Sequence, residues 1–328
     1  MIQEPYHFER ALVKNLHILI IRPGAIGDTL LTFPVIQALR AQYDDPRITF
    51  VGNAAVLPLA LAFGLVEEVS DYGNLRWSEL FSAEGIHTPE LREQLQQTEV
   101  AICWLRDPDG RVEHNLRLAG VKRVIVAPGR PPEGRRIHVV DYLAETVGVQ
   151  NVGAACNAQC IAPLSVHEND GRNALGIALH PNDRYIAIHP GSGGAQKCWP
   201  AASFTAVIEC LWKLGYPILL VAGPADHERV SCIQSSLSSP PKARMLDVLI
   251  DAPLVVVAEH LQQCKCYLGN DSGITHLAAL LGIPTIALFG PSDPAIWRPL
   301  EPHVEVIQER VLEQLPVNMV IESILRRL

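Results

Sequence analysis

The fold is decided by the stretch LHILIIRPGAIGDTLLTFPVIQALR, residues 16–40. Residues 16–22 form a short apolar run that ends at Pro23 and Gly24, which is typical of a strand buried on both faces of a parallel sheet. From Thr29 to Tyr43 the apolar residues follow helical spacing, so we expect a helix there. A buried strand, a tight turn and a helix together indicate the opening of an α/β domain.

The same alternation continues along the chain. We expect further strands at 48–53, 100–105, 121–128, 185–191 and 216–224, a strand and loop at 266–273 and a strand at 284–292. We expect helices at 138–147, 204–214, 274–281 and 316–328, and a short strand or turn followed by a helix at 254–264. Alternating strands and helices predict parallel sheets with right-handed crossovers.

Two domains are expected from the length of 328 residues. Residues 150–182 have weak periodicity and are interpreted as a linker with a short helix. The predicted fold class is therefore α/β, with two Rossmann-like doubly wound domains, residues 1–165 and 166–315, facing across a cleft. Residues 316–328 form a terminal helix that either stays with the second domain or packs back on the first.

Composition excludes several classes of protein. Acidic residues outnumber basic ones by 35 to 27, and a net charge of −8 disfavours a nucleic-acid partner. The first residues lack a secretory signal pattern, and no stretch reaches the ~18 apolar residues that a membrane span needs. The eight cysteines lack the paired spacing of a zinc site. We expect a cytoplasmic protein, with contact to a membrane surface left open.

An acid follows the first strand where a phosphate loop is often found. The turn has GxxG spacing rather than GxGxxG, and the carboxylate of Asp28 would repel a pyrophosphate at the positive end of a helix. One interpretation of Asp28 is a helix N-cap. The other is a general base that takes a proton from a hydroxyl in the cleft, and the two roles are compatible.

Two loops in the second half have the features of an anion site. The loop HPGSGGAQKCWP (189–200) contains three glycines, the hydroxyl of Ser192 and the charge of Lys197, which suit a phosphate, although a flexible loop is the alternative. The segment GNDSGITH (269–276) opens a helix whose first amides would face a ligand. These amides belong to Ser272, Gly273, Ile274 and Thr275. Asp271 either caps this helix or binds sugar hydroxyls, and His276 is interpreted as structural.

Two weaker signals complete the sequence. Asp226 lies three residues after Gly223, where doubly wound domains often place an acid for ribose hydroxyls. Residues 106–136 form a locally basic stretch, in which Arg130, Arg135 and Arg136 stand in a loop rich in Gly and Pro. This stretch is either a solvated surface or a contact for acceptor phosphates or an anionic membrane face.

Together these segments resemble glycosyltransferase family 9, the ADP-heptose:lipopolysaccharide heptosyltransferases. The resemblance is strongest in GNDSGITHLAALLGIPTIALFGPSDPAIWRP (269–299), and RPGAIGDTLLTFPVIQALR (22–40) and HPGSGGAQKCWP are also similar to family segments. It implies a GT-B fold with an acceptor-side N-terminal domain and a nucleotide-sugar-binding C-terminal domain. It also implies direct displacement with inversion, without metal or cofactor.

The resemblance also implies roles for residues. Asp28 matches the catalytic base and Lys197 the lysine that holds the donor diphosphate. Ser192 and Asp271 match donor-loop positions, and Asp226 roughly matches an acid near the ribose. The implied partners are ADP-heptose and a glycan or lipid-linked glycan acceptor, met in the cytoplasm or at the cytoplasmic face of the inner membrane.

Other functions remain open at this point. A nucleotide-sugar epimerase of the same fold would bind the same donor and need no acceptor. A binding protein would hold the nucleotide without chemistry. An NAD-dependent oxidoreductase is disfavoured because no GxGxxG follows the first strand of either half.

Overall fold

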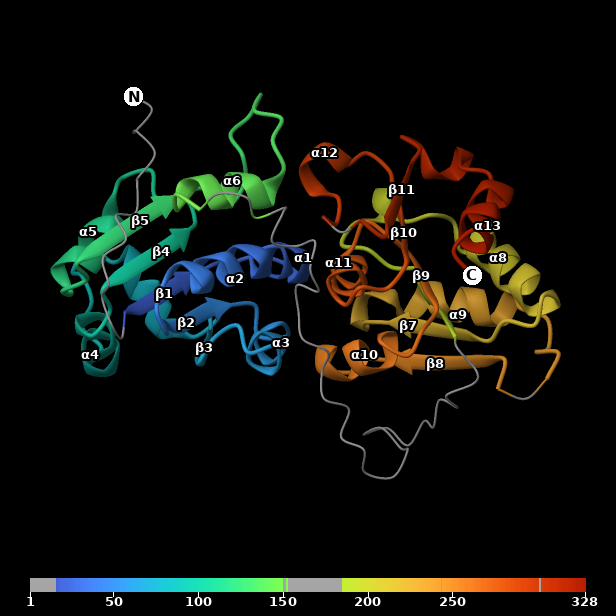
Figure 1. The fold of residues 1–328 in the computed structure, drawn as a ribbon, viewed down its shortest axis with the longest axis horizontal. Coiled ribbons are helices and arrows are strands. Elements are labelled where there is room, and N and C mark those ends of the chain that lie inside the picture. The colour runs from blue at the N-terminus through green and yellow to red at the C-terminus, as the bar shows by residue number, and fades with distance from the viewer. Residues whose placement is uncertain (1–15, 150–151, 153–184, 243, 301) are drawn as a thin grey trace. The chain divides into compact units, whose positions relative to one another are not determined.

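A computed structural model describes residues 16–149, 152, 185–242, 244–300 and 302–328. The chain divides into two compact units, Met1–Cys160 and Ile161–Leu328, each built on its own sheet (Figure 1). The domain boundary that the sequence predicts, between residues 165 and 166, lies outside the described residues.

The first unit contains a sheet of five parallel strands in the order β3-β2-β1-β4-β5. The strands are β1 (His17–Ile21), β2 (Arg47–Gly52), β3 (Glu68–Asp71), β4 (Val100–Trp104) and β5 (Arg123–Ala127). Ile18 in the central strand pairs with Ile48 on one side and Val100 on the other. All five residues of β1 are buried, as its apolar sequence predicts.

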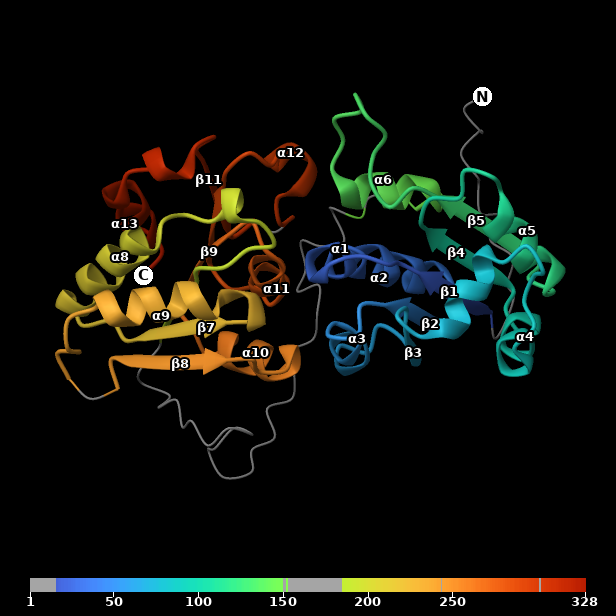
Figure 2. The same ribbon diagram turned by 180° about the vertical axis from the view of Figure 1, so that it is seen from behind.

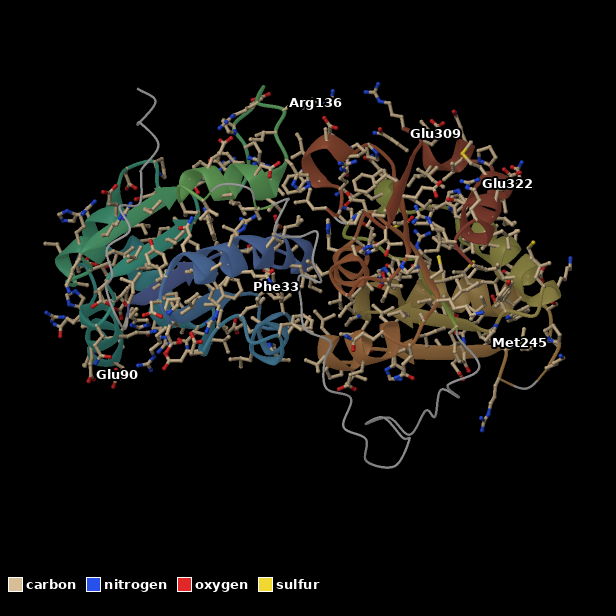
Figure 3. The ribbon with its side chains drawn as sticks, in the orientation of Figure 1. Phe33, Glu90, Arg136, Met245, Glu309 and Glu322 are labelled. Carbon is tan, nitrogen blue, oxygen red and sulfur yellow. The ribbon has the colours of Figure 1, made fainter. Side chains whose placement is uncertain are left out.

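Helices cover both faces of this sheet. They are α1 (Ile26–Leu30), α2 (Phe33–Gln42), α3 (Leu57–Ala62), η1 (Leu75–Phe81), α4 (Pro89–Gln96), α5 (Arg111–Leu118) and α6 (Val139–Thr146). Leu19 and Ile21 point to the face where η1, α4 and α5 contribute a common core. On α2, Phe33 packs edge-on against Phe50 and Phe63. Figure 3 labels Phe33 on this helix.

The predicted single helix from Thr29 to Tyr43 is wrong, because the chain forms two helices there. α1 ends at Leu30, and α2 begins at Phe33 after Thr32. Pro34 lies in the first turn of α2 and has no backbone N–H, so a continuous helix would lack one hydrogen bond at this point.

The second unit contains a sheet of six parallel strands in the order β11-β10-β9-β6-β7-β8. The strands are β6 (Ile186–His189), β7 (Ile218–Ala222), β8 (Leu246–Ile250), β9 (Cys266–Asn270), β10 (Thr285–Phe289) and β11 (Val304–Gln308). The predicted strands are confirmed here, but β8 and β11 at the two edges were not predicted, and neither was β3 at an edge of the first sheet.

The helical segments of this unit are η2 (Ala195–Lys197), α8 (Ala201–Lys213), η3 (Pro224–Asp226), α9 (His227–Ser236), α10 (Leu254–Leu261), α11 (Gly273–Leu280), α12 (Pro294–Trp297), η4 (Leu312–Gln314) and α13 (Val317–Leu325). The terminal helix α13 lies beside α8 (Figures 1 and 2) and adds Val320 and Ile324 to the core of the second unit. Residues 254–261 are helical from the first residue, so the strand or turn expected at 254 is wrong.

Both sheets reverse their strand order at one point, between β1 and β4 in the first unit and between β6 and β9 in the second. Loops that leave the carboxyl ends of strands at such a point are the usual ligand sites of open α/β sheets. Asp28 follows β1, His189 ends β6, and Asp271 follows β9. The topology therefore puts Asp28 at the first reversal point and Asp271 at the second, whereas Asp226 follows β7 and the predicted arginines follow β5.

Cysteines in the described part of the chain are free thiols. Burial raises the pKa of the thiols of Cys103 and Cys264, so both stay protonated at neutral pH. Within the same residues, no helix is long and apolar enough to cross a bilayer.

Candidate active site

Asp28 lies in the first turn of α1, at the carboxyl end of β1. Its Oδ2 accepts a hydrogen bond from the N–H of Ala25 at 3.2 Å, and its Oδ1 accepts one from Arg22 Nη2 at 3.0 Å. The helix-capping role is therefore present, although Ala25 is the N-cap residue and Asp28 reaches back from the third helical position. The Asp28 side chain remains 32% exposed. The same carboxylate can therefore cap the helix and still contact a group in solvent.

Arg22 is the partner that orients Asp28, and its role was not predicted. It is the last residue before the turn, and only 5% of its surface is exposed. Burial lowers the pKa of its guanidinium, while the Asp28 carboxylate opposes that shift. The guanidinium lies under Gly129, where a Cβ would stand 1.8 Å from Arg22 Nη1. An arginine that ends an apolar strand, six residues before an acid, was the signal in the sequence.

The predicted acceptor arginines lie in the loop between β5 and α6, which leaves the carboxyl edge of the same sheet. Arg130, Arg135 and Arg136 are all exposed, and Figure 3 shows Arg136 in this loop above α6. Arg135 forms an ion pair with Glu145 at 2.6 Å. An exposed pair of this kind adds little stability, so Arg135 can exchange Glu145 for another anion at small cost.

In the second unit, hydrogen bonds join the loop after β6 to the end of β9 and to the loop that follows it. Ser192 Oγ donates to the carbonyl of Asp271 at 2.6 Å, and Lys197 Nζ donates to Asp271 Oδ2 at 2.8 Å. Asn270 Nδ2 donates to the carbonyl of Pro190 at 2.7 Å, and Asn270 Oδ1 accepts the N–H of Trp199 at 3.0 Å. Ser192, Lys197 and Asp271, which were predicted from separate segments, therefore meet in one cluster.

The two charged side chains of this cluster differ in their exposure to solvent. The Lys197 side chain is 41% exposed, whereas that of Asp271 is only 7% exposed. An ammonium group has three donors, and Asp271 uses one of them in this structure. Lys197 can therefore hold Asp271 and still present N–H donors to an anion from solvent.

The start of α11 lies beside this pair. Ser272 is the N-cap, and its Oγ accepts the N–H of Thr275 at 3.4 Å. The N–H of Thr275 is therefore directed at Ser272. Gly273 and Ile274 are half-buried, and the first amides of a helix have no partner within that helix. These two amides are the better placed to meet an anion, because the helix dipole also favours negative charge there.

Asp226 lies beneath the loop after β6 and is 7% exposed. Its Oδ2 accepts from His189 Nε2 at 3.1 Å and from the N–H of Gly223 at 2.9 Å. Burial raises the pKa of this carboxyl, but the hydrogen bonds and the charges of His189 and Arg229 outweigh it, so the net pKa is lowered. A Cβ on Gly191 would stand 1.8 Å from Asp226 Oδ1, so this close approach requires glycine.

A hollow of about 470 Å³ opens at the other edge of the first sheet, where the strands begin. His17, Arg47 and Glu68 help to line it. The Nε2 of His17 is hydrogen-bonded to Thr49 Oγ1, and Glu68 forms an ion pair with Arg47. This hollow lies away from the carboxyl ends of the strands that carry the predicted site residues.

No described group of three or more His, Cys, Asp or Glu side chains could hold a metal ion. The cluster in the second unit instead offers the lysine Lys197, hydroxyl groups and the amides at the start of α11. These groups suit an anionic ligand.

The chain is similar to known heptosyltransferases. Residues 156–319 match the model of glycosyltransferase family 9 (heptosyltransferase). The chain is 32% identical to lipopolysaccharide heptosyltransferase 2 of Salmonella typhimurium over 318 residues, which covers 89% of this chain and 88% of that protein. A shorter alignment, 33% identical to lipopolysaccharide heptosyltransferase 3 of Escherichia coli, spans 35% of this chain and 34% of that protein.

Solved structures of heptosyltransferases share the fold. The E. coli ADP-heptose lps heptosyltransferase II has a TM-score of 0.73 at 22% identity, over 95% of this chain and 98% of that chain. E. coli heptosyltransferase WaaC with ADP has a TM-score of 0.68 at 18% identity, over 95% of this chain and all of that chain. The protein is an α/β glycosyltransferase with the GT-B fold. It belongs to glycosyltransferase family 9 (heptosyltransferase).

Proposed function

We propose that this protein transfers heptose from ADP-heptose to a hydroxyl of a lipopolysaccharide-type glycan, with inversion and without a metal ion. The observation that carries the proposal is the cluster formed by Lys197, Asp271 and the start of α11 at the reversal point of the second sheet. The names of the relatives supply the sugar and the acceptor class, and the WaaC structure with ADP supplies the nucleotide.

The donor diphosphate binds at this cluster. As the bond from the sugar to the diphosphate breaks, negative charge develops on the leaving oxygen. Lys197 and the amides of Gly273 and Ile274 stabilise that charge, since donors fixed in advance need no reorganisation during the reaction. Ser192 keeps the two loops together through Asp271. Asp226 supports the loop from below, with the ribose hydroxyls as its second proposed contact.

The acceptor hydroxyl is activated by Asp28. Its carboxylate is held by Arg22 and by the backbone of Ala25, so its exposed face keeps one orientation. It removes the proton from the hydroxyl as the oxygen attacks the sugar carbon, which is general base catalysis. Arg130, Arg135 and Arg136 supply positive charge for acceptor phosphates, and the same charge favours contact with the cytoplasmic face of an anionic membrane.

A transfer assay tests this proposal. The purified chain is incubated with ADP-heptose and a lipopolysaccharide core that lacks its terminal heptose, with and without EDTA. Mass spectrometry should show one heptose added per acceptor, equally in both samples, with one ADP released. Conversion of ADP-heptose to another nucleotide sugar without acceptor would overturn the proposal in favour of an epimerase, and loss of transfer in EDTA would overturn its metal-independent part.

A further inference from the structure

One asparagine side chain holds both ends of loop 190–199. Asn270, the last residue of β9, is fully buried. Its Nδ2 donates to the carbonyl of Pro190 at 2.7 Å and to that of Gly191 at 3.3 Å, where the loop begins. Its Oδ1 accepts the N–H of Trp199 at 3.0 Å, where the loop ends. The side-chain amide therefore closes this loop.

The partners of this amide fix which way round it lies. Backbone carbonyls only accept and a backbone N–H only donates, so Nδ2 must face Pro190 and Gly191, and Oδ1 must face Trp199. The backbone carbonyl of Asn270 also accepts a hydrogen bond from Thr275 Oγ1, near the start of α11. Asn270 therefore connects the loop to the helix start that forms the other half of the cluster.

The middle of loop 190–199 depends on the ends of the loop for its position. A Cβ at Gly193 or at Gly194 would meet nothing within 4 Å, so these two positions have open space around them. Glycine has more backbone freedom to lose than other residues, so ordering such a loop is costly. Lys197 follows this stretch and lies two residues before Trp199, which is fully buried. The position of the Lys197 ammonium group therefore depends on how firmly the end of the loop at Trp199 is held.

Other contacts hold this loop at one point each. Ser192 Oγ donates to the carbonyl of Asp271 at 2.6 Å, and Arg229 Nη1 donates to the carbonyl of Trp199 at 3.1 Å. Neither of these contacts bridges the two ends of the loop, whereas the side chain of Asn270 does.

We propose that Asn270 is a positioning residue for the donor site. By closing loop 190–199, it fixes Lys197 relative to the first amides of α11, so the charged donor and the helix amides are in place before an anion binds. Groups that are ordered in advance cost less free energy on binding. This role rests on the proposed function where it concerns the nucleotide, whereas the closing of the loop does not.

Asn270→Asp tests this role, because it removes the hydrogens of the amide and keeps its shape. At pH 8 the introduced carboxylate still accepts from Trp199 but cannot donate to Pro190. The Kd for ADP should then be about 10- to 100-fold higher than that of the wild type, since two buried carbonyls lose their donor. At pH 5.5 the buried carboxyl takes up a proton and donates as the amide did, so the Kd should return to within about threefold of the wild-type value.

The comparison is made with the wild type at the same pH, because other groups also titrate. The charged or titratable groups around position 270 are His189 at the end of β6, Lys197, Cys198, Asp226, Arg229 and Asp271. These groups and the phosphates of ADP are common to both proteins, so the ratio of the two Kd values isolates the change at position 270.

Asn115→Asp is a matched control in the first unit. Asn115 is buried, and its Nδ2 donates to the carbonyls of Leu80 and Ser82 at 3.1 and 2.9 Å, which joins α5 to the end of η1. The same chemical change there should lower the melting temperature and leave the Kd for ADP unchanged. A loss of stability alone therefore does not produce the result expected for Asn270→Asp.

Hydrogen exchange measured by mass spectrometry, without ligand, follows the loop directly. Peptides that contain residues 190–199 should exchange faster in Asn270→Asp than in the wild type at pH 8, and at the wild-type rate at pH 5.5. In Asn115→Asp these peptides should exchange as in the wild type. Unchanged exchange of the loop at pH 8, or a Kd ratio that is the same at both pH values, would overturn the proposal.

A second variant covers the case in which Asn270→Asp does not fold at pH 8. In Asn270→Ser a single hydroxyl cannot reach both ends of the loop, so the Kd and the exchange of the loop should rise at both pH values. Wild-type values in this variant would overturn the positioning role. If the wild-type chain itself did not bind ADP, the proposed function would fail, while the exchange data would still decide whether Asn270 closes the loop.

Discussion

At the scale of single residues, the orientation of Asp28 depends on its two donors. Arg22 holds one carboxylate oxygen and the N–H of Ala25 holds the other. A base with a fixed direction suits a displacement in which the hydroxyl must approach from one side. We therefore expect turnover to depend on the negative charge of the Asp28 carboxylate rather than on the size of this side chain.

Asp28→Asn should therefore reduce turnover by roughly 10²–10⁴-fold, because the amide cannot take a proton from the acceptor. Binding of ADP should change little. Steady-state kinetics and calorimetric titration measure the two effects. Asp44→Asn, an exposed acid at the opposite edge of the sheet, is the control and should leave both unchanged. Near-normal turnover in Asp28→Asn would rule it out as the base.

Lys197→Ala should weaken ADP binding by about 10- to 100-fold, since it removes a charged donor and leaves the buried Asp271 carboxylate unpaired. Titration with ADP at fixed ionic strength measures this change. Lys213→Ala removes an exposed lysine at the end of α8 and should have no effect. Equal affinity in the two variants would remove Lys197 from the phosphate site.

At the scale of elements, the loop after β6 is shaped by what lies under it. Gly191 and Gly193 are two residues apart, yet a Cβ on Gly191 would collide with Asp226, whereas a Cβ on Gly193 meets nothing within 4 Å. Gly191→Ala should therefore destabilise the second unit by about 1–3 kcal/mol. Gly193→Ala should leave the melting temperature near that of the wild type. Calorimetry decides, and equal melting temperatures would show that the loop adapts without cost.

In the first unit, η1 is joined to the start of α4 by one carboxylate. Glu79 accepts from the hydroxyl and N–H of Thr88 and from the N–H of His87. These hydrogen bonds, led by that of the Thr88 hydroxyl, lower the pKa of Glu79. A lowered pKa gives stability that is present above the unfolded-state value of ~4.3 and is lost as pH falls through the folded-state value.

Glu79→Gln should therefore lower the free energy of unfolding at pH 7, and the difference from the wild type should shrink as pH falls below ~4. Urea unfolding at both pH values measures it. Glu113→Gln, which removes an exposed ion pair with Arg117 within α5, should have a small effect at either pH. A difference for Glu79→Gln that grows on acidification would contradict the assignment.

The elements were predictable where burial is complete. The strands β1, β4, β7, β9 and β10 are buried along their whole length and appear as apolar runs. Three of the four edge strands, β3, β8 and β11, are only partly buried and mix polar and apolar residues in EVSD, LDVLI and VEVIQ. The fourth, β5, is also partly buried, but its sequence RVIVA is an apolar run and it was predicted. The pairing of the other three depends on neighbouring strands, which a local pattern does not contain.

The site was predictable in its residue types and less so in its contacts. Lys197, Asp271 and the start of α11 stand in Gly-rich loops at strand ends, where phosphate chemistry is expected. The roles of His189 and Asn270 depend on partners far away in the sequence. His189 touches Asp226 and Ser272, which are 37 and 83 residues away. Only the folded chain brings those groups within hydrogen-bond distance.

At the scale of the whole molecule, a ligand that binds one unit should stabilise that unit. With ADP at about 100 times its Kd, the gain is about 2.7 kcal/mol, or roughly 5–10 °C in melting temperature. A thermal-shift series with ADP, UDP, GDP and CDP should show the largest shift for ADP, and EDTA should leave it unchanged. An equal shift with UDP would contradict adenine as the nucleobase of the donor. Loss of the shift in EDTA would indicate a bound metal.

The contact between Arg22 and Gly129 links two positions that are far apart in the chain. Because the guanidinium occupies the space that a side chain at 129 would need, residue 129 can be larger than glycine only if the side chain at 22 is shorter or moves away. Among natural variants of this enzyme, a larger residue at 129 should occur together with a shorter side chain at 22. Such covariation of positions 22 and 129 would show that the arrangement that orients Asp28 has been maintained during evolution.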